Sequence, residues 1–195
     1  MHGLINRSFQ CFLRDTYGAP LWSDVAREAR LGFDSFEPML IYDPSLTEAV
    51  IAAAARQLAR PRETVLEDLG TYLVSHPNVE ALRRVLRFGG VTFVDFLHSL
   101  EDLPGRGRLA LPDLDLPSLH LSDEGPGQFT LLCRSPLLGA GHVVVGLLRA
   151  MADDYGALVL LEHQGSGRQG ESIAINLLDQ RFAEGRRFEL AGRAE

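Results

Sequence analysis

Histidines, cysteines and paired carboxylates are the side chains of this sequence that could carry chemistry. The six histidines stand at positions 2, 76, 98, 120, 142 and 163, and no two of them lie within five residues of each other. A metal site built from neighbouring ligands is therefore not predicted. Cys11 and Cys133 are too few and too far apart for a disulfide framework or a multi-cysteine zinc site. Adjacent carboxylates such as Asp153 and Asp154 point about 100° apart on a helix, so we expect them on solvated faces.

Standard catalytic motifs are missing from the sequence. It has no Walker loop, no HExxH, no GxSxG and no EF-hand loop. The glycine-rich segment Gln164–Gly170 is not followed by a helix with a lysine, so phosphate binding is not expected there. We therefore expect no catalytic residues, no metal site and no enzymatic activity.

The overall composition narrows the class of protein. Of 195 residues, 46% are hydrophobic, and the formal net charge is -7. A chain of this length, folded as one unit, buries roughly 70% of its unfolded surface, which allows a full core and an internal cavity. All 19 basic residues are arginines, scattered among 26 acidic residues, which argues against a nucleic-acid partner. The apolar stretch 136–148 is shorter than the about 20 residues that span a bilayer, and no secretory signal opens the chain, so we expect a cytoplasmic protein without membrane contact.

Apolar residues recur at three- and four-residue steps through the first half of the chain, which predicts helices. A first helix runs to about Asp15, and the prolines at positions 20 and 61 begin two others. The Ser45–Glu48 segment has the spacing of a capping box before a helix over 50–58. Two more helices are expected over 79–86 and 91–103, and Pro104 with Gly105 ends the last one.

Short alternating or apolar runs follow Pro104 and predict strands. These runs cover residues 109–111, 117–121, 128–133, 158–163, 171–176 and 187–190. One amphipathic helix is expected over 141–155, and Gln164–Gly170 is expected to be a hairpin loop. The predicted fold class is α+β: a helical N-terminal half followed by a mostly antiparallel sheet with one long helix. We expect a single domain over residues 1–195, with a helical part over 1–104 and a sheet-containing part over 105–195.

The N-terminal run Met1-His-Gly-Leu-Ile-Asn-Arg-Ser-Phe9, with Leu13–Gly18 and Trp22–Val25 after it, resembles the opening of a known family. This is the heme nitric oxide/oxygen binding (H-NOX) family, the gas-sensing domain of soluble guanylate cyclase and of bacterial sensors. Further segments are similar to the same family in the same order: Phe96–Leu103, Leu116–Leu119, Ser135 with Gly139, and Val143–Leu148. The resemblance extends from Met1 to about Leu190, and it implies the same succession of helices and sheet.

The resemblance implies a heme held between the two halves by a single helix histidine, but that position falls on Pro104 here. Proline has no ligating atom. The family's Tyr-x-Ser-x-Arg motif, which holds the heme propionates, falls on Cys133, Ser135 and Leu137, so only the serine remains. Loss of the arginine removes a charge-assisted bond worth about 1.5 to 3 kcal/mol. Heme is thus the cofactor that the resemblance implies, and the sequence lacks its usual ligand.

The apolar positions of the family's heme pocket persist. Ile5 and Phe9 match the cavity-lining positions of the first helix, Val143 falls where some members place a gas-binding tyrosine, and Pro117 matches the proline that packs on the porphyrin. Leu100 belongs to the same set. His120 and His142 are the candidates for an alternative heme ligand, and a Cys133 thiolate is a third.

Two hypotheses follow from the resemblance. The first is a stand-alone sensory domain that binds heme weakly or not at all, and that acts through an apolar cavity and a signalling partner. The resemblance implies a histidine kinase, a diguanylate cyclase or a nucleotide cyclase as that partner, with an apolar small molecule or a diatomic gas as the ligand. The second is a true heme gas sensor that uses His120 or His142, in which Val143 would favour nitric oxide over oxygen.

Overall fold

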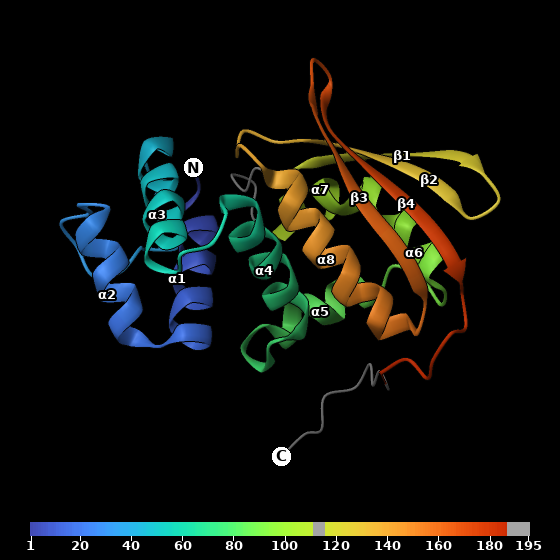
Figure 1. The fold of residues 1–195 in the computed structure, drawn as a ribbon, viewed down its shortest axis with the longest axis horizontal. Coiled ribbons are helices and arrows are strands. Elements are labelled where there is room, and N and C mark those ends of the chain that lie inside the picture. The colour runs from blue at the N-terminus through green and yellow to red at the C-terminus, as the bar shows by residue number, and fades with distance from the viewer. Residues whose placement is uncertain (111–115, 187–195) are drawn as a thin grey trace.

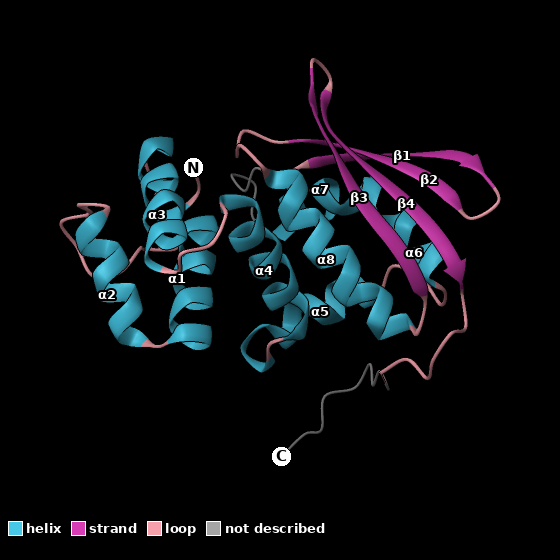
Figure 2. Cartoon of the chain, viewed as in Figure 1, coloured by secondary structure: helices cyan, strands magenta, loops and turns pink. Residues whose placement is uncertain are grey.

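In the computed structural model, which describes residues 1–110 and 116–186, helices fill the N-terminal half and a sheet follows them (Figure 1). Colouring by secondary structure separates the two parts (Figure 2). The helices before the sheet are α1 (Gly3–Tyr17), α2 (Ala19–Glu28), α3 (Pro44–Gln57), α4 (Arg62–Ser75), α5 (Glu80–Arg87), α6 (Phe93–Ser99) and α7 (Leu103–Ala110), with 3-10 turns η1 (Pro77–Val79) and η2 (Leu100–Asp102).

The sheet is antiparallel throughout, with strand order β1-β2-β4-β3. Its strands are β1 (Ser118–Gly125), β2 (Gln128–Arg134), β3 (Leu158–Gly167) and β4 (Gly170–Asp179), and helix α8 (Ala140–Tyr155) connects β2 to β3. The predicted α+β class is confirmed, including the single long helix within the sheet-containing half. The expected hairpin is present too, with both of its strands extending into the Gln164–Gly170 segment.

One face of the sheet packs on helices and the other does not. Alternation along the strands places Leu131, Ile173 and Ile175 on the inner face, where all three are fully buried. Helix α8 lies across this face and also packs along α4 (Figure 1). The α4–α8 contact is close because two glycines form it: a Cβ on Gly70 would lie 2.0 Å from the Val143 carbonyl oxygen, and one on Gly146 would lie 1.9 Å from the Glu67 carbonyl oxygen.

Two local predictions, the cap at Ser45 and the strand 109–111, were wrong. Ser45 does not cap α3: Asp43 does, with its Oδ1 accepting the Ser45 amide at 2.8 Å, because Pro44 occupies the first helical position. The predicted strand 109–111 is not one, since Leu109 and Ala110 close helix α7 and residue 111 lies outside the described residues. The predicted strand 187–190 also lies outside the described residues.

Pro104 does not end a helix, contrary to the prediction. The chain passes from α6 through the 3-10 turn η2, and α7 begins at Leu103, so Pro104 stands in the first turn of a new helix. Proline is tolerated there because a first-turn N–H has no partner within the helix. The prediction correctly took into account that proline lacks an N–H. It placed Pro104 at the end of the preceding helix, whereas Pro104 lies at the start of α7.

Asp154 corrects the expectation that adjacent carboxylates lie on solvated faces. Its side chain is fully buried at the end of α8, where Arg83 of α5 holds it with two bonds, Nε to Oδ2 at 2.5 Å and Nη2 to Oδ1 at 3.1 Å. A buried carboxylate needs such a partner, because desolvation penalises an unpaired charge. Within the described ranges, no helix combines the length and the apolar character needed to cross a membrane.

Candidate functional site

Pro104, the position that the resemblance assigns to the heme ligand, is buried and has no donor atom. Pro104 lies in the first turn of α7, directly after Leu100 and the rest of η2, and both residues are buried. Arg106 Nη2 donates a hydrogen bond of 2.7 Å to the carbonyl oxygen of Ser99, the last residue of α6. This bond connects the end of α6 to α7. Pro104 thus lies between the 3-10 turn η2 and the body of α7, with a ring of carbon atoms at the position that the resemblance assigns to the imidazole.

The apolar residues that the resemblance assigns to the family's pocket lie in or against the main hydrophobic core. Phe9 of α1 and Leu100 of η2 are both buried in this core, while Ile5 and Val143 are partly buried and pack against it. Val143 sits at the α4–α8 contact, next to Gly70. Pro117 is half-buried in the segment that leads into β1. These residues thus lie in or against the core on α1, η2 and α8, and their assignment to a heme pocket stays a prediction.

The positions of the family's propionate anchors lie at the end of β2 and in the turn after it. Cys133 is buried, and burial, with the nearby Glu171 carboxylate adding to it, raises the pKa of its thiol to about 12. The thiol is thus neutral at physiological pH and a poor metal ligand. Ser135 Oγ accepts the Leu137 amide at 3.1 Å, and Leu137 itself is buried. These three side chains offer one hydroxyl, which caps its own turn.

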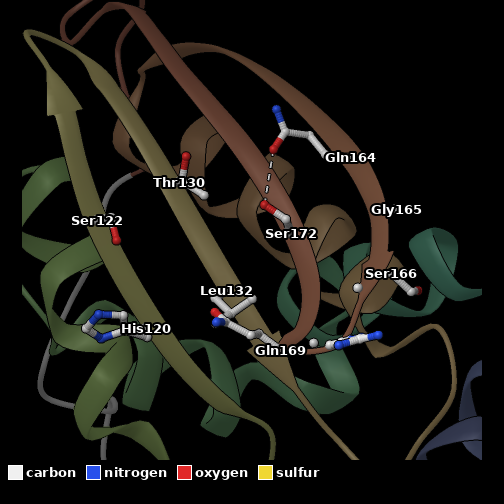
Figure 3. Close-up of a pocket in the computed structure, with 12 residues that line it drawn as sticks. His120, Ser122, Thr130, Leu132, Gln164, Gly165, Ser166, Gln169 and Ser172 are labelled. Atoms are coloured by element: carbon white, nitrogen blue, oxygen red, sulfur yellow. Dashed lines mark hydrogen bonds between the residues drawn. The ribbon is translucent and has the colours of Figure 1, made fainter.

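His120 lies on the outer face of the sheet, beside Glu101 of η2. Its side chain is 69% exposed, and its Nδ1 lies 2.7 Å from Glu101 Oε1. It lines an open pocket of about 590 Å³ between β1–β2 and the β3–β4 hairpin (Figure 3). The other residues that line this pocket are mostly polar or glycine: Ser122, Thr130, Leu132, Gln164, Gly165, Ser166, Gly167, Arg168, Gln169, Gly170 and Ser172. The expectation that His120 approaches the apolar core is wrong, because strand alternation turns it to the other side from buried Leu119.

His142 begins α8 and forms a cluster with three other side chains. Its ring stacks on that of His163 of β3, with centroids 3.9 Å apart and 18° between the planes. His142 Nδ1 lies 3.3 Å from Glu67 Oε1 of α4, and His163 Nε2 lies 2.8 Å from Glu171 Oε2 of β4. We call these four residues the histidine pair cluster.

Nothing in the sequence spacing signals the histidine pair cluster. His142 and His163 are 21 residues apart, and the contact arises because the start of α8 lies over the inner-face position of His163 in the sheet. Gly141 makes this possible: its amide donates to Glu171 Oε2 at 3.2 Å, and a Cβ there would lie 2.8 Å from His163 Nε2. Among the described residues, no three His, Cys, Asp or Glu side chains gather closely enough to hold a metal ion.

Comparison with protein families gives a match over most of the chain. A model of the family described as haem-NO-binding (HNOB) matches residues 2–163. Soluble guanylate cyclase gcy-31 of Caenorhabditis elegans is 27% identical over 154 residues, which is 79% of this chain and 22% of that protein. Soluble guanylate cyclase 89Da of Drosophila melanogaster is 22% identical over 183 residues, 92% of this chain and 27% of that protein. The chain therefore spans about a quarter of the length of these curated relatives.

Solved structures agree on the fold. An H-NOX protein from S. oneidensis, in the Fe(II) ligation state and with three substitutions, aligns with a TM-score of 0.78 at 18% identity, over 92% of this chain and 97% of that one. The Fe(II) unliganded H-NOX protein from K. algicida aligns with a TM-score of 0.74 at 16% identity, over 97% and 100% of the two chains. At these identities the likeness establishes the fold and leaves the chemistry of the site to the residues themselves.

Proposed function

Because the chain belongs to the haem-NO-binding family, we propose that it is a sensory domain that works without the family's usual heme ligand. The family binds heme to sense nitric oxide or oxygen, and its domains are sensors rather than catalysts. The single observation that carries the proposal is the buried Pro104 at the ligand position. The proposed unit is the whole chain, with its helical part joined to the sheet through the α4–α8 contact.

The residues at the family's heme positions do not fit the cofactor. Pro104 offers no ligand, the Cys133 thiol is neutral, and Leu137 replaces a cation by an apolar side chain. A heme pocket needs at least an axial ligand and partners for two carboxylates. The proposed function therefore involves no bound heme. The remaining apolar positions, Ile5 and Phe9 among them, are proposed to belong to a core that senses an apolar molecule or responds through its own packing.

A true heme sensor that uses His120 or His142 is the second candidate function. His120 projects from the outer face of the sheet beside Glu101, which opposes this role. His142 is engaged on both sides, by the His163 ring and by the Glu67 carboxylate. Either imidazole would have to leave a carboxylate partner and turn toward the core. The geometry therefore favours the first proposal over the second.

The proposed output is a contact with a signalling protein. Two relatives of this chain are named as guanylate cyclases, and the chain covers only about a quarter of each. A cyclase or a kinase, on the same or a separate chain, is therefore the proposed partner. The setting that we propose is the cytoplasm, which fits the two free thiols of Cys11 and Cys133.

An absorption spectrum tests the proposal directly. We express the protein with a heme precursor, reduce it with dithionite, and record the spectrum before and after adding nitric oxide. The expected result is no stoichiometric Soret band. A stoichiometric band that shifts with nitric oxide would overturn the proposal. In that case loss of the band in His142→Ala but not His120→Ala, or the reverse, would identify the ligand.

A further inference from the structure

Two imidazole rings face each other at the junction of α4, α8 and the sheet. The side chains of His142 and His163 are only 16% and 13% exposed, and their rings are stacked in parallel. Histidine is the side chain whose ordinary protonation lies between pH 5 and 8. Two such rings in van der Waals contact form a coupled pair, in which a charge on one ring opposes a charge on the other.

The hydrogen bonds of His163 use both of its nitrogens in the neutral form. Its Nδ1 accepts the Gly165 amide at 3.2 Å, so the proton of the neutral ring is on Nε2, which faces Glu171 Oε2. A second proton must go to Nδ1, and a protonated Nδ1 cannot accept from Gly165. Protonation of His163 therefore breaks a bond to the backbone.

His142 differs from His163 in this respect. Its Nδ1 donates to Glu67 Oε1, because an ionised carboxylate can only accept. A proton added to its Nε2 keeps that bond and places the positive ring beside a carboxylate. His142 can therefore become charged without losing its contact to α4, while His163 cannot become charged without losing Gly165.

The bond that His163 would lose lies at an irregular point of the sheet. The register of β3 and β4 shifts between His163 and Gly165, and Gly165 has a positive φ of 99°. Beyond this bulge, the hairpin tip projects past the rest of the molecule (Figure 1) and forms one wall of the outer-face pocket (Figure 3). The Gly165–His163 bond thus fixes the base of a projecting element.

Charged groups around the pair favour the first proton and oppose the second. Glu67 also accepts from Arg149 Nη2 at 3.0 Å, so with neutral rings the two glutamates exceed this arginine by one negative charge. One imidazolium balances that excess, and a second leaves two like charges 3.9 Å apart. Other titratable or charged groups at the pair or the hairpin include the neutral thiol of Cys133 opposite Glu171, Arg62 paired with Glu48 beside Gly139, and Arg134, which donates to the Gln169 carbonyl. Arg168 stands in the hairpin turn and lines the outer-face pocket, and Glu162 lies in β3.

We propose that the His142–His163 pair is a proton-sensitive switch that controls the β3–β4 hairpin. The first proton goes to His142 and leaves the stack in place. The second goes to Nδ1 of His163, frees the Gly165 amide and loosens the hairpin tip over the outer-face pocket. This inference concerns residues outside the family's ligand and anchor positions, and it rests on the proposed function only in that His142 does not ligate heme.

Nuclear magnetic resonance on the full chain, purified without added heme, tests the switch. We titrate labelled protein from pH 8 to pH 5 and follow the two imidazole rings and the Gly165 amide. The His163 ring is expected to become protonated only after the His142 ring, and the Gly165 signal is expected to change together with that of His163. A Gly165 signal that does not follow His163 would overturn the proposal.

Two variants separate the coupling from ordinary titration. His142→Phe keeps a flat ring without a charge, so the His163 ring is expected to become protonated at a higher pH than in the unaltered protein. His120→Phe on the outer face is the matched control and should leave the protonation of His163 unchanged. Glu67→Gln keeps both rings, in case His142→Phe does not fold, and should lower the pH at which His142 becomes protonated. An unchanged His163 titration in His142→Phe, or an unchanged His142 titration in Glu67→Gln, would refute the switch.

Discussion

At the scale of the residue, the bond between Tyr72 and Asp15 makes the stability of the helical part depend on pH. The Tyr72 hydroxyl donates to Asp15 Oδ2 at 2.6 Å, and this bond is the main reason that the pKa of Asp15 is lowered. Burial, followed by the bond to Asp15, raises the pKa of Tyr72. The Asp15 contribution is complete above about pH 4 and is lost as the pH falls through its lowered value. The Tyr72 contribution is complete below about pH 10 and is lost as the pH rises through its raised value.

Removing this hydroxyl should therefore change both ends of the stability profile. We expect Tyr72→Phe to cost about 1.5 to 3 kcal/mol at pH 7 and to flatten the loss of stability below about pH 4 and above about pH 10. Urea denaturation between pH 3 and pH 11 measures this. Tyr17→Phe is the control, since its hydroxyl lies 3.5 Å from Asp68 Oδ2 and should cost less. Equal costs for the two variants, or an unchanged acid limb in Tyr72→Phe, would contradict the assignment.

Single residues also show where sequence reasoning ends. The proposed loss of a ligating atom at Pro104 and of a cation at Leu137 follows from the resemblance of the sequence to the family. The burial of Asp154 and the pairing of His142 with His163 are not, because both depend on contacts between distant segments. Periodicity reports which face of an element is apolar, but it does not report which polar side chain finds a partner inside the fold.

At the scale of the element, the contact between α4 and α8 depends on glycine. A methyl group on Gly146 would overlap the Glu67 carbonyl oxygen of α4, so the helices would have to separate. We expect Gly146→Ala to cost about 1 to 3 kcal/mol, although alanine favours an isolated helix. Gly105→Ala in α7 is the matched control, because nothing lies within 4 Å of its Cβ position; it should gain about 0.5 to 1 kcal/mol.

Thermal and urea unfolding of the two alanine variants measure this difference. Separation of α4 from α8 should also change the histidine pair cluster, since Glu67 lies on α4 and His142 lies on α8. The ring signals of His142 and His163 are therefore expected to shift in Gly146→Ala and to stay in place in Gly105→Ala. A gain of stability in both variants would show that α4 and α8 do not pack this closely.

The elements themselves could be predicted with more success than their ends. Apolar spacing located α1, α4 and α8, and alternation located β2 and β4, because both patterns are set by which side of an element is buried. Ends depend on one or two backbone hydrogen bonds. The same missing N–H lets proline stop a helix or begin one, and at Pro104 the sequence did not distinguish a single stopped helix from the succession α6, η2 and α7.

At the scale of the whole molecule, the positions that the resemblance assigns to the heme pocket belong to one hydrophobic core. Phe9, Leu100, Cys133 and Leu137 come from four different segments of this core. The succession of helices and sheet is that of the family, while our proposal is that the ligand and two of the anchor residues are absent. The fold is thus set by apolar burial spread over many positions, whereas heme binding depends on a few polar atoms that substitution removes without unfolding the chain.

This separation of fold from binding leads to a gain-of-function test. Pro104→His, Cys133→Tyr and Leu137→Arg together restore an imidazole and two propionate partners at the positions where the family has them. A new stoichiometric Soret band is expected in the triple variant, and none in Cys133→Tyr with Leu137→Arg alone, because the axial ligand is still absent there. Circular dichroism confirms that both variants are folded. A folded triple variant without heme would mean that Pro104 does not occupy the ligand position, and the proposed loss of heme would then need another cause.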